Sequence, residues 1–189
     1  MRNTYLSLAC VLTPFVCAAQ SGLERRIAAA GDTPAQFHFA AREGVCGNGK
    51  TYFRTEDDGW YGTGFYSTDG MRADPCVNGP VRVVVTRAAK EVVRVETYVG
   101  PVPADAPPAQ ELGAVPAKEA VAYLLSLAAT GDGRPARDAL TPAMLADSSV
   151  VTPELLAIAK DQSRSRDIRR SAINWLSRRR VRRAGARAS

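Results

Sequence analysis

Alternation of apolar and polar positions marks a β segment in the first half of the chain. Residues 36–40 alternate, with Phe37 and Phe39 on one face. Two longer runs, 81–86 and 92–99, flank a short turn and predict an antiparallel hairpin. Because their apolar residues recur at every second position, we expect a sheet with one face buried.

Beyond this segment the apolar period becomes that of a helix. Val121, Leu124, Leu125 and Ala128 form a stripe at helical spacing. Thr152-Pro153-Glu154 combines an N-cap hydroxyl, a proline suited to the first helical position and an acid near the positive helix end. The pattern predicts two antiparallel helix pairs, 116–130 with 135–147 and 152–162 with 166–178, and a short amphipathic helix at 22–30. Within 135–147 we expect an interruption at Pro142.

A glycine-rich loop, Gly44 to Gly79, lies between the predicted strands and contains Cys46 and Cys76. In an oxidising compartment an even pair of cysteines is most simply a disulfide. Closing a loop of about thirty residues stabilises a small domain by roughly 3–4 kcal/mol. A metal site or a reactive thiol is the alternative, but the chain has one histidine to complete a ligand set.

The same loop carries four aromatic residues, Trp60, Tyr61, Phe65 and Tyr66, which are the candidate contact residues for a ligand or partner. On a glycine-rich loop they could form a stacking platform for a sugar or a peptide. The alternative is a small core folded over the disulfide. Because exposed aromatics are uncommon without a ligand, the sequence favours the core.

The N-terminus has the pattern of a secretion signal. A positive charge precedes an apolar run over residues 5–17, and small residues precede a cleavage point near Ala19. Pro14 argues against a buried helix, because proline breaks a helix interior. Bulky Phe15 and Val16 argue against acylation at Cys17. The sequence therefore predicts a periplasmic or extracellular protein, with no transmembrane segment after cleavage.

Positive charge is concentrated at the C-terminus. Of the 25 basic residues among 189, ten arginines lie between Arg164 and Arg187 beside a single acid, Asp167, while the whole chain carries +6. This basic tail, a candidate contact for anionic envelope surfaces, is typified by Arg178, Arg179, Arg180, Arg182 and Arg183. A solvated, disordered tail is the alternative. Export makes nucleic acid an unexpected partner, although arginine can bind its phosphates.

Catalytic chemistry has little support in the residue pattern. His38, the one histidine, lies in a strand pattern with no accompanying nucleophile motif. The acids around Glu56 do not have the spacing of an EF-hand loop, and no phosphate-binding glycine loop or dinucleotide fingerprint occurs. We therefore expect no catalytic residues, no metal and no cofactor.

Two stretches carry a family resemblance. The helical stretch reads Leu145-Ala146-Asp147-Ser148, Leu155-Leu156-Ala157-Ile158-Ala159-Lys160-Asp161 and Arg169-Arg170-Ser171-Ala172-Ile173-Asn174-Trp175-Leu176. The upstream stretch reads Phe37-His38-Phe39-Ala40-Ala41-Arg42-Glu43-Gly44-Val45-Cys46-Gly47, Cys76, Gly79-Pro80-Val81-Arg82 and Thr97-Tyr98-Val99-Gly100. Together they resemble the β segment and opening helices of exported bacterial HEAT-repeat proteins, over about four-fifths of the mature chain.

The resemblance implies an α-solenoid that presents a surface to other macromolecules and brings no catalytic residues with it. A solenoid usually needs about three stacked repeats. Because this chain ends soon after Trp175-Leu176, the expected form is a short, truncated solenoid of two helix pairs.

The predicted fold is α+β: a disulfide-tied antiparallel β segment followed by two HEAT-like helix pairs. The predicted divisions are a signal peptide at 1–19, the β segment at 20–100, a Pro/Ala-rich linker at 101–115, the helical segment at 116–178 and a basic disordered tail at 179–189. The first functional hypothesis is a non-enzymatic interaction or scaffold module of the bacterial cell envelope that binds another envelope protein. The alternative is a small ligand-binding protein or hydrolase that uses the Gly44–Gly79 loop.

Overall fold

The computed structural model describes residues 22–50, 52–55, 59–62, 76–104, 106–147 and 151–185. The predicted signal peptide lies outside these residues. The elements, in chain order, are α1 Gly22–Ala29, β1 Ala35–Phe39, β2 Cys46–Gly47, β3 Tyr52–Thr55, β4 Gly59–Gly62, β5 Val77–Asn78, β6 Val81–Ala88, β7 Glu91–Val99, β8 Gln110–Ala114, α3 Ala117–Thr130, α4 Gly133–Asp138, α5 Leu140–Leu145, α6 Val151–Lys160 and α7 Arg166–Gly185. The α+β class and the helix at 22–30 are confirmed.

The larger sheet has four strands in the order β7-β6-β1-β8. The predicted hairpin is confirmed, because β6 and β7 pair antiparallel from Val81↔Val99 to Ala88↔Glu91. A bulge interrupts this register: Thr86 pairs with Arg94 and Arg87 with Val92, so Val93 is left over. The extra residue reverses the alternation, and Val93 is 49% exposed while Val92 packs against the core.

Strand β8 occupies part of the predicted linker, so that prediction is wrong over Gln110–Ala114. The strand lies parallel to β1 at the edge of the sheet. Backbone bonds from Gln110 N to Pro34 O (2.7 Å) and from Val115 N to His38 O (2.9 Å) hold it there. Its sequence lacks apolar alternation because an edge strand buries little side-chain surface, which is why periodicity does not reveal it.

The smaller sheet has the order β4-β3-β2-β5, and all its pairs are antiparallel. The predicted disulfide joins Cys46 of β2 to Cys76, which precedes β5, with a Cα–Cα distance of 5.2 Å. Gly100, at φ +100°, lies directly after β7 and is packed so closely against Gly47 that a Cβ at either glycine would overlap backbone atoms. The disulfide-tied sheet is thereby fixed to the end of the hairpin.

The helices share one hydrophobic cluster with the larger sheet in the described part of the chain. Phe37 of β1 meets the edge of the Tyr123 ring of α3, with centroids 6.3 Å apart. Arg42 N, beyond β1, donates to Leu145 O of α5 at 2.8 Å. The β segment and the first helices are therefore packed together and not merely tethered.

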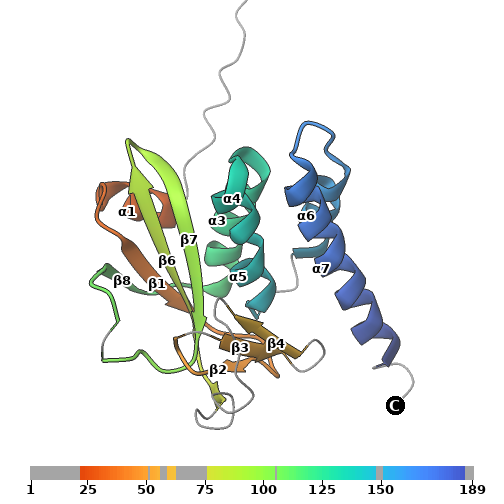
Figure 1. The fold of residues 1–189 in the computed structure, drawn as a ribbon, viewed down its shortest axis with the longest axis horizontal. Helices are drawn as coiled ribbons and strands as arrows, with labels where there is room; N and C mark the ends of the chain where they lie inside the picture. The colour runs from red at the N-terminus through yellow and green to blue at the C-terminus, as the bar shows by residue number, and fades with distance from the viewer. Residues whose placement is uncertain are drawn as a thin grey trace, which may run out of the picture.

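The interruption expected within 135–147 is present, but it falls at Ala139, where α4 ends and α5 begins, three residues before Pro142. Pro142 lies in the first turn of α5. Its ring would clash with the backbone carbonyl of Asp138, four residues earlier, in an unbroken helix, so the helix is interrupted here. In Figure 1 the sheet, the α3–α5 group and the α6–α7 pair lie side by side, with α3 against α6 and with α4 and α5 against α7. The second helix pair thus stacks on the first.

Helix α7 continues through Gly185. The prediction of a disordered tail is therefore wrong for residues 179–185, which form helical backbone, whereas 186–189 lie outside the described residues. Arginine is a good helix former and extends a helix already fixed by its apolar first turns. Among the described residues, no helix combines the length and the apolar character needed to cross a membrane.

Candidate functional site

An apolar groove runs between α3 and α6. Its volume is about 580 Å³. Its floor consists of Val121, Leu125 and Ile158, which are 2%, 4% and 3% exposed. The remaining lining residues are small or charged: Lys118, Ala122, Ser126 and Ala129 of α3, and Glu154, Ala157 and Asp161 at α6 and its end. Small residues form the walls, and the floor side chains themselves are almost fully buried.

Charged groups lie along this apolar floor, with two acids against one base. Lys118 and Glu154 belong to the first turns of their helices, whereas Asp161 directly follows α6. The Oε2 atom of Glu154 is buried and makes no hydrogen bond to any described residue. A buried carboxylate oxygen without a donor is costly, so a donor brought by a ligand would be favourable there.

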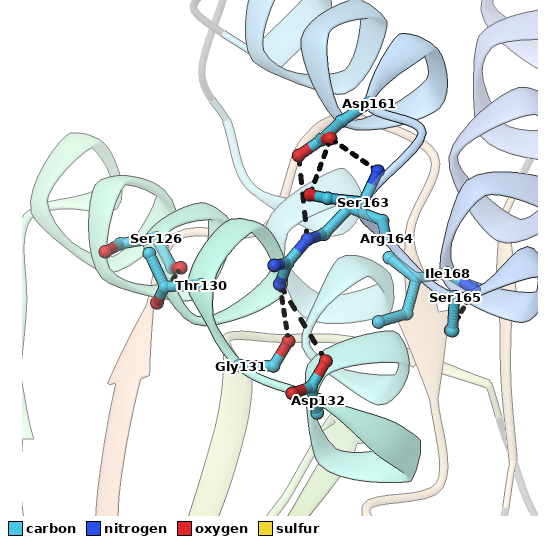
Figure 2. Close-up of polar contacts among 9 residues, drawn as sticks. All are labelled: Ser126, Thr130, Gly131, Asp132, Asp161, Ser163, Arg164, Ser165 and Ile168. Carbon is cyan, nitrogen blue, oxygen red and sulfur yellow. Dashed lines mark hydrogen bonds and ion pairs between the residues drawn. The ribbon is translucent and has the colours of Figure 1, made fainter.

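Arg164 connects the end of the groove to the preceding helix pair, as Figure 2 shows. Its Nη1 donates to the Gly131 carbonyl at 3.0 Å. The same nitrogen lies 3.9 Å from Asp132 Oδ1, and Nε lies 3.6 Å from Asp161 Oδ2. Because the arginine side chain is only 17% exposed, these contacts fix the turn after α6 against the turn after α3.

Asp161 organises the turn between α6 and α7. Its Oδ1 accepts hydrogen bonds from Ser163 Oγ at 2.7 Å and from Ser163 N at 2.9 Å. These bonds, the side-chain bond first, lower the pKa of the Asp161 carboxyl. Ser165 Oγ then accepts from Ile168 N at 3.4 Å and caps α7 as its position predicts. The polar turn therefore sets where α6 and α7 lie beside α3.

The aromatic candidates are only partly placed. Trp60 and Tyr61 lie on β4, where they pair in register with Arg54 and Phe53 of β3. Phe65 and Tyr66 lie outside the described residues. The stacking platform therefore stays a prediction.

The basic candidates lie on the last turns of α7. The guanidinium of Arg178 is 5.6 Å from the centre of the Trp175 ring, within the range of a cation–π contact. Arg179, Arg180, Arg182 and Arg183 continue along the same helix. They are therefore carried on an ordered element and not on the expected disordered one.

His38 lies on the larger sheet, with Nδ1 3.6 Å from Glu111 Oε1. Gln36 Nε2 also donates to the Glu111 carboxylate, at 2.6 Å. In the part of the chain that the structure describes, no three His, Cys, Asp or Glu side chains gather as a metal site would require. The contacts of His38 join strands β1 and β8.

Sequence reasoning missed the groove. The stripe that includes Val121 and Leu125 predicts a buried face, and both residues are buried. Their position beside Ile158 depends on how the two helix pairs stack, which the stripe does not show. The available signal was the set of small residues Ala122, Ser126 and Ala129, which recur at helical spacing beside that stripe. No family model, curated protein or solved structure matches this chain, so its function has to be inferred from its own geometry.

Proposed function

We propose that this protein is an exported, non-enzymatic interaction module of the bacterial cell envelope, which holds a segment of another envelope protein in the α3–α6 groove. The groove itself carries this proposal. Contiguous apolar surface that stays open between polar rims is typical of interaction sites. At about 580 Å³ it has the size of sites that bury a compact ligand or a few side chains.

The shape of the groove favours a peptide-like occupant. Ala122 and Ala129 on one wall and Ala157 on the other let a backbone approach the apolar floor closely. Such a groove between parallel ridges suits an amphipathic helix, whose apolar side chains enter at intervals of one turn. The expected partner segment therefore presents two or three aliphatic side chains on one face.

Glu154 indicates a further feature of the partner. Glu154 lines the groove, and its buried Oε2 has no hydrogen-bond partner among the described residues, so a donor nearby would be favourable. Glu154 and Asp161 carry two negative charges against the one positive charge of Lys118, so the groove has a net charge of −1. A lysine or arginine next to the aliphatic residues of the partner would satisfy Glu154 and complement that charge.

The wider context supports the same role. The Cys46–Cys76 disulfide suits an oxidising compartment, as the N-terminal pattern predicts. The stacking of two helix pairs agrees with the resemblance to exported HEAT-repeat proteins, which present such surfaces to macromolecules. A small hydrolase or ligand-binding protein that uses the Gly44–Gly79 loop is the competing class.

The decisive experiment fills the groove without disturbing its helices. Ala157→Arg places a long charged side chain on the wall, while Leu156→Arg places the same side chain on the next residue of α6, which is 43% exposed and does not line the groove. Both variants and the wild-type chain are used for cross-linked capture from the envelope fraction. Any protein retained is then purified and titrated against each chain.

The proposal expects one discrete protein that binds the wild type and Leu156→Arg and whose affinity for Ala157→Arg falls at least tenfold. Equal binding to all three chains would show that the interface lies outside the groove. Absence of any direct partner would refute the interaction module, and ligand screening of the aromatic loop would then test the competing class.

A second contact is proposed from the helical end of α7, which we infer docks on anionic envelope surfaces. Each arginine near an anionic membrane contributes about 1 kcal/mol, falling off within a Debye length. Replacing Arg179, Arg180, Arg182 and Arg183 by glutamine keeps a helix-forming sequence and removes four charges. Salt-sensitive binding to vesicles with anionic lipid should be lost in this variant. Unchanged binding would exclude the tail as the docking element.

A further inference from the structure

A second, smaller cavity lies where α1, the β6–β7 turn and the C-terminal half of α3 meet. Its volume is about 220 Å³. Tyr123, Leu127 and Thr130 of α3 line it, and Ser126 borders both this cavity and the groove. The two sites therefore lie on different sides of the same helix.

The β6–β7 bulge builds one wall of this cavity. It places Arg87 opposite Val92 and turns both toward the cavity. Arg87 Nη1 donates to Ala28 O of α1 at 3.0 Å, and Nη2 donates to Lys90 O of the turn at 2.6 Å. One guanidinium thus holds the turn against α1 and keeps the cavity in place.

The turn itself has an unusual backbone. Ala89 and Lys90 have φ values of +52° and +71°, where glycine or asparagine is the ordinary occupant. Non-glycine residues in this region are strained, and such strain is often found where function fixes a side chain. Here the conformation places Lys90, an exposed cation, at the rim of the cavity.

Tyr123 supplies a donor without an acceptor. The side chain is 7% exposed, and its hydroxyl makes no hydrogen bond to any described residue. Burial, more than the nearby Glu24 carboxylate, raises its pKa to about 12, so the hydroxyl keeps its proton at neutral pH. Because the hydroxyl oxygen has almost no accessible surface, it can donate to an oxygen in the neighbouring cavity only once the side chains that cover it move aside.

The charged and apolar residues that complete the lining indicate the chemical class of the ligand. Arg87 and Lys90 oppose Glu24, so the cavity has a net charge of +1, and Ile27, Val92 and Leu127 are apolar. A monoanion matches this balance, whereas a phosphate dianion would meet the Glu24 carboxylate with excess charge. At about 220 Å³ the cavity is smaller than a drug-sized pocket, so the apolar part of the ligand is short.

We propose that this cavity binds a small aliphatic monocarboxylate, whose carboxylate accepts from the Tyr123 hydroxyl and faces Lys90 and Arg87 while its alkyl part contacts the apolar lining. This site is separate from the partner groove and does not depend on the proposed function. A ligand with so few atoms makes few contacts, so we expect weak binding. The interaction must therefore be measured by a method suited to weak binding.

The test titrates butyrate into the full chain labelled with ¹⁵N and follows the backbone amide signals of Ala28, Lys90 and Tyr123. Butyramide, which has nearly the same shape but no charge, is the ligand control. Tyr123→Phe removes only the unpartnered hydroxyl, so the variant should keep its fold. Lys90→Asn removes the cation, and Ala89→Asn changes the turn in the same way without changing its charge.

Butyrate should shift the three signals in a saturable way, and butyramide should bind at least tenfold more weakly. The Tyr123→Phe variant should lose about tenfold in affinity, as expected for a hydrogen bond to a charged group. Lys90→Asn should lose about two- to fivefold, because the cation is exposed, and Ala89→Asn should bind like the wild type. Absence of the shifts, equal binding of butyramide, or unchanged affinity of Tyr123→Phe would overturn the proposal.

Discussion

The polar junction at Arg164 should determine whether the second helix pair stays docked on the first. We predict that Arg164→Met destabilises the protein, because methionine keeps much of the aliphatic stem but removes the guanidinium. The guanidinium supplies the donor to the Gly131 carbonyl and joins the turns after α3 and α6. Without it, those two turns have no polar connection through residue 164.

The size of the expected destabilisation follows mainly from the hydrogen bond between Arg164 and the Gly131 carbonyl. A charged donor to a partly buried carbonyl contributes about 1.5–3 kcal/mol. The ion pairs add little, because the Asp132 and Asp161 side chains are 88% and 44% exposed and their distances to the guanidinium are 3.9 and 3.6 Å. We therefore expect the free energy of unfolding to fall by about 2 kcal/mol, most of it from the lost donor.

The assay is urea denaturation followed by the fluorescence of Trp175, which lies on α7, in a Trp60→Phe background. With an m-value of about 2 kcal/mol/M, the midpoint should fall by about 1 M. Arg166→Met, two residues away at an exposed position, is the matched control and should change the midpoint little. Equal midpoints for the two variants would refute the assigned role of Arg164.

The remaining predictions concern the disulfide, the strained turn and the Asp161 carboxyl. Replacing Cys46 and Cys76 together by alanine should lower the free energy of unfolding by about 3–4 kcal/mol, measured by the same denaturation, and a loss below about 1 kcal/mol would contradict the loop-closure argument. Lys90→Gly should raise the melting temperature, because glycine adopts φ +71° without strain; a fall would show that the turn is not strained. The pKa of Asp161 is lowered in the folded protein, chiefly by the Ser163 hydrogen bonds, so its stabilising contribution is present above the ordinary pKa of 3.8 and is lost as the pH falls through the lower folded value. Asp161→Asn should therefore weaken the dependence of stability on pH in that acidic range, and identical pH profiles for variant and wild type would exclude this contribution.

Some of this fold could be predicted because burial leaves a periodic signal. Val81, Val83 and Val85 are all fully buried on one face of β6, so alternation identified that strand and its hairpin. The Cys46–Cys76 pairing was predicted because two cysteines in an oxidising context have one simple outcome. Both features depend on local patterns or residue counts and not on neighbours brought close by folding.

Other features depend on distant neighbours and left no such signal. Strand β8 is held by backbone bonds to Pro34 and from Val115 to His38, which apolar periodicity does not record. The bulge that brings Arg87 and Val92 to one cavity shifts the register by a single residue, whereas simple alternation along β7 would place Val93 on the same face as the buried Val95. Both errors arise because side-chain pattern specifies burial, whereas partner and register are set by the whole sheet.

Helix α3 shows why a correct helix prediction did not reveal the sites. Its apolar stripe predicted one buried face, yet Leu124 packs in the core, Leu125 forms the floor of the groove and Tyr123 reaches the second cavity. A helix that is apolar over most of its surface is expected to be surrounded by other elements. Periodicity gives the extent of that surface but not which element meets each part of it. Helices α4, α5, α6 and α1 divide most of the surface of α3 among them, so both proposed sites are consequences of packing around this one helix.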